Sequence, residues 1–346
     1  MFKRLLVATG FMALLLFPSI ARAQDTSNNG ALNLTTSPLP VSMVGKPGET
    51  VSTKLSVKNG GAKAEELKVS LLKFSAYGED GKPQLLDRAV GDKYFDWVHF
   101  SENTFVMQPG QSHEVTMFVD FPGEASLGYY YAVTFSRLNP PKSDQTNKLE
   151  GGTAVLVLAE ARTAGEKRSI ELESFTASKK VFEFLPATLQ IKLKNTGNIH
   201  LAPSGNVFIF KGSEKVATLD VNQGGGNILP DSKRVFTSEW TEGFPVYETK
   251  KGATGGAGSD GKAATSLKWD LSKISSLRFG KYKAILTMAY SDGVRDVPVE
   301  ATVNFWVIPW RIIAFILIPI IIFIAVLVGY IKLKRRTKKS GSGDKK

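Results

Sequence analysis

Few residues in this chain combine the types and the spacing that chemistry requires. The segment from Gly256 to Lys262 has the GxxxxGK spacing of a phosphate-binding loop, in which glycine amides surround the phosphates and the lysine reaches the outermost one. Ala263 follows, so the hydroxyl that would bind magnesium is missing. No buried strand is predicted before the motif, and no helix is predicted after it. We therefore interpret residues 249–265 as a glycine-rich hairpin loop.

The other reactive residue types do not form a catalytic set. Ser70 and Lys73 match an SxxK motif, but on a strand they would point to opposite faces. The three histidines stand alone in the sequence, and acidic pairs such as Glu79-Asp80 lie in glycine-rich turns. The chain has no cysteine, which excludes disulfides, a thiol nucleophile and thiolate zinc sites. We predict no enzymatic activity, no cofactor and no metal site, which disfavours an exported hydrolase.

One aromatic cluster is a candidate for ligand binding. Gly128 is followed by Tyr129, Tyr130 and Tyr131. On a strand, Tyr129 and Tyr131 would share one face and Tyr130 would lie on the other. Phenol rings on a surface stack against sugars and peptides. We therefore predict Tyr130 as a ligand-binding residue.

The elements that must position these residues are strands. Alternating apolar residues bounded by Pro/Gly and Asn-Gly turns recur from residue 51 onwards, which is typical of short antiparallel strands. The fold class is therefore predicted to be all-β, with two tandem Ig-like antiparallel β-sandwiches and one C-terminal transmembrane helix. The first sandwich is expected over residues 24–164 and the second over 165–308. The predicted strands are 51–57, 67–71, 115–121, 129–135, 155–159, 169–173, 189–193, 207–210, 216–221, 235–240, 282–289 and 297–307.

A short stretch of internal sequence similarity suggests that the second sandwich repeats the first. The segment Leu55–Asn59 parallels Ile191–Asn195 in residue type, and a turn follows each at an offset of 136 residues. Without disulfides, hydrophobic packing must hold each sandwich together. We expect Trp97 and Trp240 to fill the two cores.

The basic charge of the chain reflects membrane topology. The formal net charge is +12, but residues 1–23, Arg311 and residues 332–346 carry all except +1 of it. Residues 24–310 are thus nearly neutral and present no electrostatic footprint for a phosphate backbone. Nucleic acid is therefore excluded as a partner.

Two apolar segments define the expected topology. Residues 1–23 have the basic start, apolar middle and Ala-Arg-Ala end of a signal peptide. Residues 309–331 contain twenty uncharged residues, Ile312–Ile331, long enough to cross a bilayer. No LPxTG-like motif precedes this helix, which favours a permanent anchor. The expected anchor residues combine interfacial aromatics with a basic flank: Trp306, Trp310, Arg311, Tyr330, Lys332, Lys334, Arg335 and Arg336.

Residues 332–346 then form a basic cytoplasmic tail, since basic flanks stay inside. The protein is expected in the cell membrane as a single-pass protein, with its N-terminal domains extracellular. It would contact the lipid bilayer through residues 309–331.

This assembly resembles the WxL-interacting proteins of Gram-positive surfaces. The first sandwich shares with that family the strings Phe105–Ser112, His113–Phe121 and Gly128–Tyr130, and the second shares Lys194–His200 and Ile228–Arg234 leading to Trp240. The resemblance implies tandem Ig-like domains on a membrane anchor. It also implies peptidoglycan binding by the first domain and protein binding by the second.

Together these features predict a membrane-anchored bacterial cell-surface protein without enzymatic activity. Its tandem domains would bind cell-wall glycan, namely peptidoglycan, and/or other surface proteins. The alternative is an accessory subunit of a membrane secretion or pilus apparatus, whose membrane helix contacts partner helices.

Overall fold

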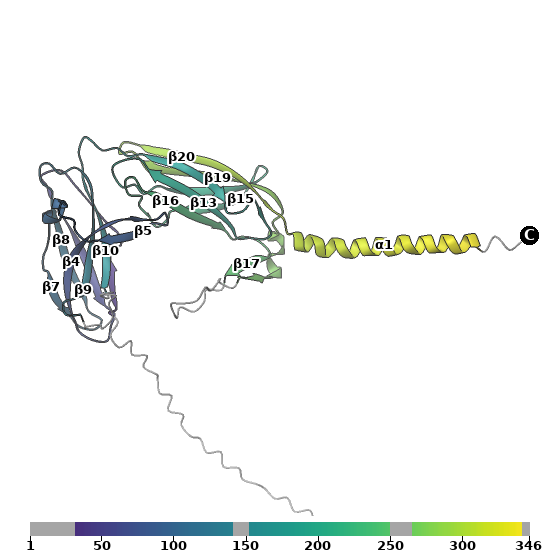
Figure 1. Ribbon diagram of the computed structural model, residues 1–346, viewed down its shortest axis with the longest axis horizontal. Coiled ribbons are helices and arrows are strands. Elements are labelled where there is room, and N and C mark those ends of the chain that lie inside the picture. Colours follow the sequence, from purple (N-terminus) through teal and green to yellow (C-terminus); the bar gives the residue numbers. More distant parts are fainter. Residues whose placement is uncertain (1–31, 141–151, 250–264, 341–346) are drawn as a thin grey trace, which may run out of the picture.

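The computed structural model describes residues 32–140, 152–249 and 265–340. The predicted signal peptide, residues 1–23, and most of the glycine-rich loop, residues 250–264, lie outside the described residues. Figure 1 shows two β-sandwiches set at an angle, with a long helix projecting from the second one.

The first sandwich contains ten strands and one 3-10 helix between Leu34 and Ala161. They are β1 (Leu34–Ser37), β2 (Val41–Gly45), β3 (Thr50–Asn59), β4 (Glu65–Tyr77), β5 (Lys82–Leu86), η1 (Lys93–Trp97), β6 (Val98–Phe100), β7 (Thr104–Met107), β8 (Ser112–Asp120), β9 (Leu127–Arg137) and β10 (Gly152–Ala161). One sheet has the order β1-β3-β8-β6, and the other has the order β2-β10-β9-β4-β5 with β7 also paired to β4.

The two sheets of this sandwich bury the apolar residues that alternate along the strands. Leu55 and Val57 of β3 and Val115, Met117 and Val119 of β8 are all fully buried. Between β1 and β2 the chain leaves one sheet for the other, with cis peptide bonds before Pro38 and Pro40. Trp97 is half-buried and packs against this core from outside, so it contributes to the core without filling it as predicted.

The second sandwich uses ten strands and one 3-10 helix between Ile170 and Val307. They are β11 (Ile170–Ala177), β12 (Val181–Phe182), β13 (Ala187–Asn195), β14 (Ser204–Lys211), β15 (Glu214–Val221), β16 (Lys233–Trp240), β17 (Val246–Thr249), β18 (Thr265–Lys268), η2 (Leu271–Ser276), β19 (Gly280–Ser291) and β20 (Asp296–Val307). The sheet orders are β11-β13-β16 and β12-β20-β19-β14-β15, and β17 and β18 form a separate hairpin.

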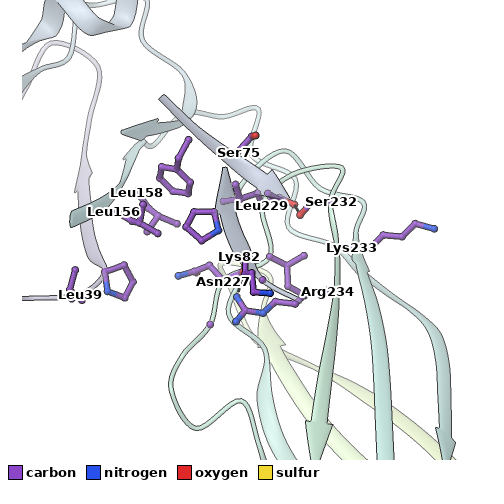
Figure 2. Close-up of a pocket in the computed structure, with 17 residues that line it drawn as sticks. Leu39, Ser75, Lys82, Leu156, Leu158, Asn227, Leu229, Ser232, Lys233 and Arg234 are labelled. Atoms are coloured by element: carbon purple, nitrogen blue, oxygen red, sulfur yellow. Dashed lines mark hydrogen bonds between the residues drawn. The ribbon is translucent and has the colours of Figure 1, made fainter. Parts of the chain in front are cut away.

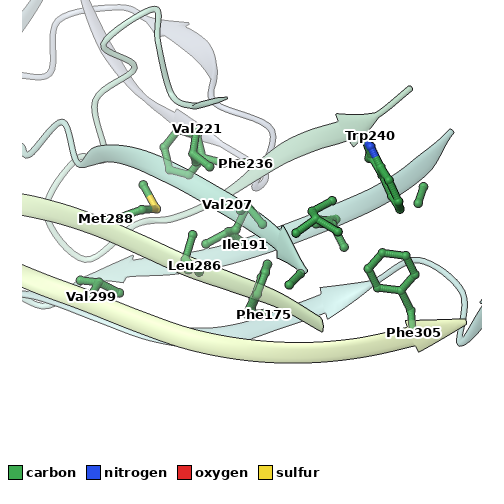
Figure 3. Close-up of a cluster of buried hydrophobic side chains, with 14 of the residues drawn as sticks. Phe175, Ile191, Val207, Val221, Phe236, Trp240, Leu286, Met288, Val299 and Phe305 are labelled. Carbon is green, nitrogen blue, oxygen red and sulfur yellow. The ribbon is translucent and has the colours of Figure 1, made fainter. Parts of the chain in front are cut away.

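Aromatic side chains close one end of the second core. Trp240 is fully buried, with its ring centroid 4.9 Å from that of Tyr282 and 6.2 Å from that of Phe305. Figure 3 shows Trp240 and Phe305 at this end, with Phe236 and Met288 toward the other. The expectation that Trp240 fills the core is therefore confirmed.

The two sandwiches share one strand order. Strands β1, β3 and β8 correspond to β11, β13 and β16, and β2-β10-β9-β4-β5 corresponds to β12-β20-β19-β14-β15. In each sandwich the second strand pairs in parallel with the last one, β2 with β10 and β12 with β20. This correspondence supports the predicted internal repeat. The fold is thus all-β, with two Ig-like sandwiches and one C-terminal apolar helix, as predicted.

The two similar segments, Leu55–Asn59 and Ile191–Asn195, each end in a buried asparagine. Asn59 at the end of β3 accepts a hydrogen bond from Gly61 N (2.9 Å) and donates to Lys63 O (2.8 Å). Asn195 at the end of β13 accepts one from Gly197 N (2.9 Å) and donates to Ile199 O (2.7 Å). Both asparagines are fully buried.

The asparagine amide also reaches a neighbouring segment in each sandwich. Asn59 Nδ2 lies 3.4 Å from Met107 O, and Asn195 Nδ2 donates to Ile228 O at 2.8 Å. Each buried side chain therefore has its polar atoms satisfied and links its own turn to a neighbouring segment.

The last element is α1 (Trp310–Ser340). Its segment Trp310–Lys332 has a mean hydropathy of 3.3 and contains no buried residue, and it is long and apolar enough to cross a membrane. Figure 1 shows α1 pointing away from the second sandwich, on the side opposite the first.

Replacing Asn195 by alanine should destabilise the second sandwich. Asn195→Ala removes the partner of the Gly197 amide and of the Ile199 carbonyl, whereas Ile228 O keeps its bond from Leu201 N, at a cost of roughly 2–4 kcal/mol in the free energy of unfolding. Urea unfolding of the purified chain in detergent measures this cost. The matched control is Asn206→Ala, since the exposed Asn206 bonds only to Asp220 and should change stability by less than about 0.5 kcal/mol. Equal effects of the two substitutions would contradict this role.

Candidate functional site

The β4–β5 hairpin of the first sandwich reaches across to the second (Figure 1). At its turn, Glu79 O accepts a hydrogen bond from Val235 N of β16 at 2.6 Å. The Glu79 carboxylate also forms an ion pair with Lys192 Nζ of β13 at 2.7 Å. A backbone hydrogen bond and an ion pair therefore hold the hairpin onto one sheet of the second sandwich.

Arg234 lies directly beneath this hairpin. Gly81 has a φ of +76°, a backbone conformation that favours glycine, and a Cβ atom there would displace the Arg234 guanidinium. The guanidinium donates to Asn227 O at 2.9 Å and lies 5.1 Å from the ring centroid of Phe236. Arg234 thus fills the space between the hairpin turn and the second sandwich.

An apolar cluster continues the contact between the domains. It contains Phe74, Ala132 and Leu158, which are buried, and Leu72, Tyr130, Leu156 and Leu229, which are partly buried. Leu229 is its only member from the second sandwich. The Tyr130 ring lies 5.8 Å from the Phe74 ring and 5.8 Å from the His200 ring, in both cases edge to face.

The three tyrosine side chains of β9 point to the strand faces that the sequence predicts. Tyr131 is buried in the first core and donates to Tyr94 O at 3.0 Å, and Tyr129 packs against Trp97 with ring centroids 4.8 Å apart. Tyr130 takes the other face, which the second sandwich covers. Its hydroxyl is buried, and this burial raises the pKa of the phenol. The ring is therefore part of the domain junction, and a ligand-binding role for Tyr130 stays a prediction.

Charged residues line the peptide that joins the sandwiches. Glu160 of β10 is buried and pairs with Arg168, which also lies 3.3 Å from Glu166 Oε2. His200 is buried nearby, and its Nδ1 atom has no hydrogen-bond partner. Burial, together with the charge of Arg168, lowers the pKa of His200 to about 4. His200 is therefore neutral at physiological pH.

A cavity of about 290 Å³ opens between the sandwiches (Figure 2). Its walls come from β4, β5, β10 and the segment before β2 in the first sandwich, and from residues 226–234 in the second. The lining residues are Leu39, Pro40, Phe74, Ser75, Ala76, Gly81, Lys82, Pro83, Leu156, Leu158, Gly226, Asn227, Ile228, Leu229, Ser232, Lys233 and Arg234.

The cavity has an apolar wall and a polar end. Figure 2 places Leu156 and Leu158 along the wall, whereas Lys82, Asn227 and Arg234 gather at one end. Lys233 points away from the cavity in the same view. At the rim, Leu39 is 60% exposed. Lys82 is paired with Asp80 at 2.6 Å, so the cavity offers apolar contact beside the Arg234 cation, and it is open to the outside.

Three of the predicted anchor residues, Trp306, Trp310 and Arg311, lie where β20 passes into α1. Trp306 near the end of β20 is exposed, and Trp310 begins α1 with its ring 5.2 Å from the Arg311 guanidinium. Arg311 Nε also lies 3.2 Å from Glu183 Oε1, which ties the start of the helix to the second sandwich. Tyr330, Lys332, Lys334, Arg335 and Arg336 follow on α1, and the side chains of the last three lie outside the described residues.

Among the described residues, those suspected of chemistry form no common site. Lys73 Nζ bonds to Asp92 Oδ1 at 3.1 Å, so its polar contact is not with Ser70. Within residues 32–140, 152–249 and 265–340, no group of three acidic or histidine side chains is arranged to hold a metal ion. The GxxxxGK segment lies outside this part of the chain.

No family model matches the sequence, and no curated protein matches it either. Several solved structures are similar in part. The class 5 fimbriae chaperone CfaA has 14% identity over 80% of this chain and 100% of its own, with a TM-score of 0.35. The chaperone–tip adhesin pre-assembly complex CsuC–CsuE of Acinetobacter baumannii has 12% identity over 78% and 97%, with a TM-score of 0.34. The E. coli chaperone DraB has 12% identity over 78% and 98%, with a TM-score of 0.32.

Buried His200 makes stability depend on pH. Native His200 takes up a proton only near pH 4, whereas the unfolded chain takes one up near pH 6.5, so the unfolded state binds more protons between these values. The free energy of unfolding should therefore be highest above pH 6.5 and fall by up to about 3 kcal/mol as the pH approaches 4.

Urea unfolding at a series of pH values tests this dependence. His200→Phe keeps an aromatic ring against Tyr130 and should flatten the pH profile between 6.5 and 4. The control is His99→Phe, because His99 is exposed on β6 and far from the junction in sequence. A His200→Phe profile as steep as that of the unchanged protein would contradict the assignment.

Proposed function

We propose that this chain is a membrane-anchored binding protein without enzymatic activity, which engages a protein partner in the cleft between its two sandwiches. It would serve as an accessory subunit of a larger membrane or surface assembly, such as a secretion or pilus apparatus. The open cavity of about 290 Å³ at the domain junction is the main support for this proposal.

The chemistry of the cavity fits an extended peptide segment. Its wall of Leu156, Leu158 and Leu229 suits an apolar side chain, and the Arg234 guanidinium at its polar end suits a carboxylate. Lys82 at the same end is already paired with Asp80 at 2.6 Å. Residues of both sandwiches form it, so only the docked pair presents the complete surface. Such clefts between domains are frequent binding sites.

The apolar helix supports the proposed location. The segment Trp310–Lys332 is long enough to span a bilayer, and the basic residues that follow it favour a cytoplasmic C-terminus. The two sandwiches would then lie outside the cell, at the end of the helix opposite the basic tail. A cleaved signal peptide over residues 1–23 would be consistent with this export.

Binding to cell-wall glycan is the other proposed activity, and it follows from the resemblance to WxL-interacting proteins. The aromatic ring predicted for that role, Tyr130, has its hydroxyl buried at the junction. Within the described residues, the cavity gives a specific surface to a protein partner. We therefore place the protein partner first and treat glycan as an outcome of the test.

Site-directed cross-linking in membranes tests the proposal. The natural chain has no cysteine, so Leu39→Cys places one benzophenone-maleimide label at the cavity rim. The control is Val106→Cys on β7, since Val106 is similarly exposed, at 57%, but does not line the cavity. We expect the label at position 39 to yield a discrete protein adduct, at least about fivefold more than at 106.

The nature of the adduct separates the alternatives. An adduct that muramidase digestion releases from the wall would support glycan binding in place of a protein partner. Equal labelling at positions 39 and 106 would contradict a binding site in the cleft.

A further inference from the structure

The second sandwich carries an added element that the first one lacks. In the first sandwich, β8 connects to β9 through residues 121–126. In the second, the corresponding connection from β16 to β19 runs from residue 241 to 279 and includes β17, β18 and η2. Figure 1 shows the β17 hairpin beside the start of α1. The added element therefore lies at the end of the sandwich from which the helix departs.

This element exposes large apolar side chains. Leu271 and Ile274 are 70% and 61% exposed, and Trp269, Leu277 and Phe279 are also exposed. A contiguous patch of this kind on a folded domain marks an interaction surface. We call these five residues the apolar foot.

The apolar foot is continuous with the first turns of the membrane helix. A cavity of about 600 Å³ lies between them, and its wall is almost entirely apolar. Four foot residues, Trp269, Leu271, Ile274 and Leu277, line one side, and Ile312, Phe315 and Ile316 of α1 line the other. Trp269 is held in place by Phe244, with ring centroids 5.7 Å apart.

The depth of this contact matches the interfacial layer of a bilayer. From Trp310 to Ile316 the helix rises about 9 Å. A foot that faces these residues would thus reach the same depth, which is where amphipathic segments lie in the boundary between headgroups and acyl chains. Trp269 and Trp310 are of the residue type that is enriched at this level.

The charges around the foot suit anionic lipid headgroups. Residues 265–281 contain four cations, Lys268, Lys273, Arg278 and Lys281, against the single anion Asp270. Lys268 is partly neutralised by Glu248 at 2.8 Å. The remaining balance is positive, which favours a surface that carries phosphate groups.

We propose that residues 267–279 insert their apolar side chains into the outer leaflet beside α1 and so seat the second sandwich on the membrane surface. This inference rests on the proposed membrane span and adds to it a second, independent contact with lipid. The occupant of the cavity is therefore lipid, and the sandwich is held at a defined orientation by two attachments.

Fluorescence quenching in reconstituted vesicles tests this proposal. The full chain is placed in vesicles of phosphatidylcholine and phosphatidylglycerol with a nitroxide-labelled lipid whose quencher lies near the headgroups. Single cysteines carry an environment-sensitive fluorophore at the foot (Ile274→Cys), on the span (Phe315→Cys) and on the distant β19–β20 turn (Val294→Cys). Val294 is 94% exposed and serves as the matched control.

We expect the fluorophores at positions 274 and 315 to be quenched at least about threefold more than the one at 294. Adding Leu271→Asp and Leu277→Asp to the Ile274→Cys chain should abolish quenching at 274 and leave quenching at 315 in the corresponding chain unchanged. Because both leucines are exposed, these substitutions spare the core.

The possible outcomes distinguish insertion of the apolar foot from insertion of the membrane span alone. Quenching at 315 but not at 274 would contradict insertion of the apolar foot and still support the membrane span. Absence of quenching at both positions would contradict both the insertion of the apolar foot and the membrane span. Quenching at 274 that persists with the two aspartates would also overturn the foot, because insertion would then not depend on its apolar side chains.

Discussion

Docking of the β4–β5 hairpin onto β16 is the contact on which the rest of this structure depends. The hydrogen bond from Val235 N to Glu79 O joins the edge of one sandwich to a turn of the other. The absence of a side chain at Gly81 lets Arg234 pack beneath that turn. If this contact opened, the cavity would lose its polar end and Tyr130 would be exposed. The proposed binding surface is thus a property of the docked pair, and neither sandwich has it alone.

The two sandwiches share one strand order and one buried asparagine at the end of an equivalent strand. Asn59 and Asn195 bind backbone groups in the same way at the ends of equivalent strands. The sandwiches differ mainly in what is added to this common frame. The first extends its β4–β5 hairpin toward its neighbour, and the second adds β17, β18 and η2 beside the start of the helix. One addition connects the domains, and the other extends toward the proposed membrane.

The fold was largely predictable because its signals are local. Alternation at Val115, Met117 and Val119 identifies a strand from adjacent residues alone, and a long uncharged run identifies α1. The cavity was not predictable, because Leu39, Leu158 and Leu229 meet only through tertiary packing over long sequence separations. Tyr130 shows both cases. The face of the strand on which it lies could be predicted from strand geometry, but its contact with His200 could not, because His200 belongs to the other sandwich.

The most direct test of fixed docking is the distribution of distances between the sandwiches. Nitroxide labels at Val106→Cys in the first and Val294→Cys in the second report this distance by electron–electron resonance, because the unlabelled chain has no cysteine. Fixed docking predicts one narrow distribution of distances for the full chain in lipid nanodiscs. A broad distribution, as expected for two sandwiches on a flexible linker, would contradict a preformed cleft.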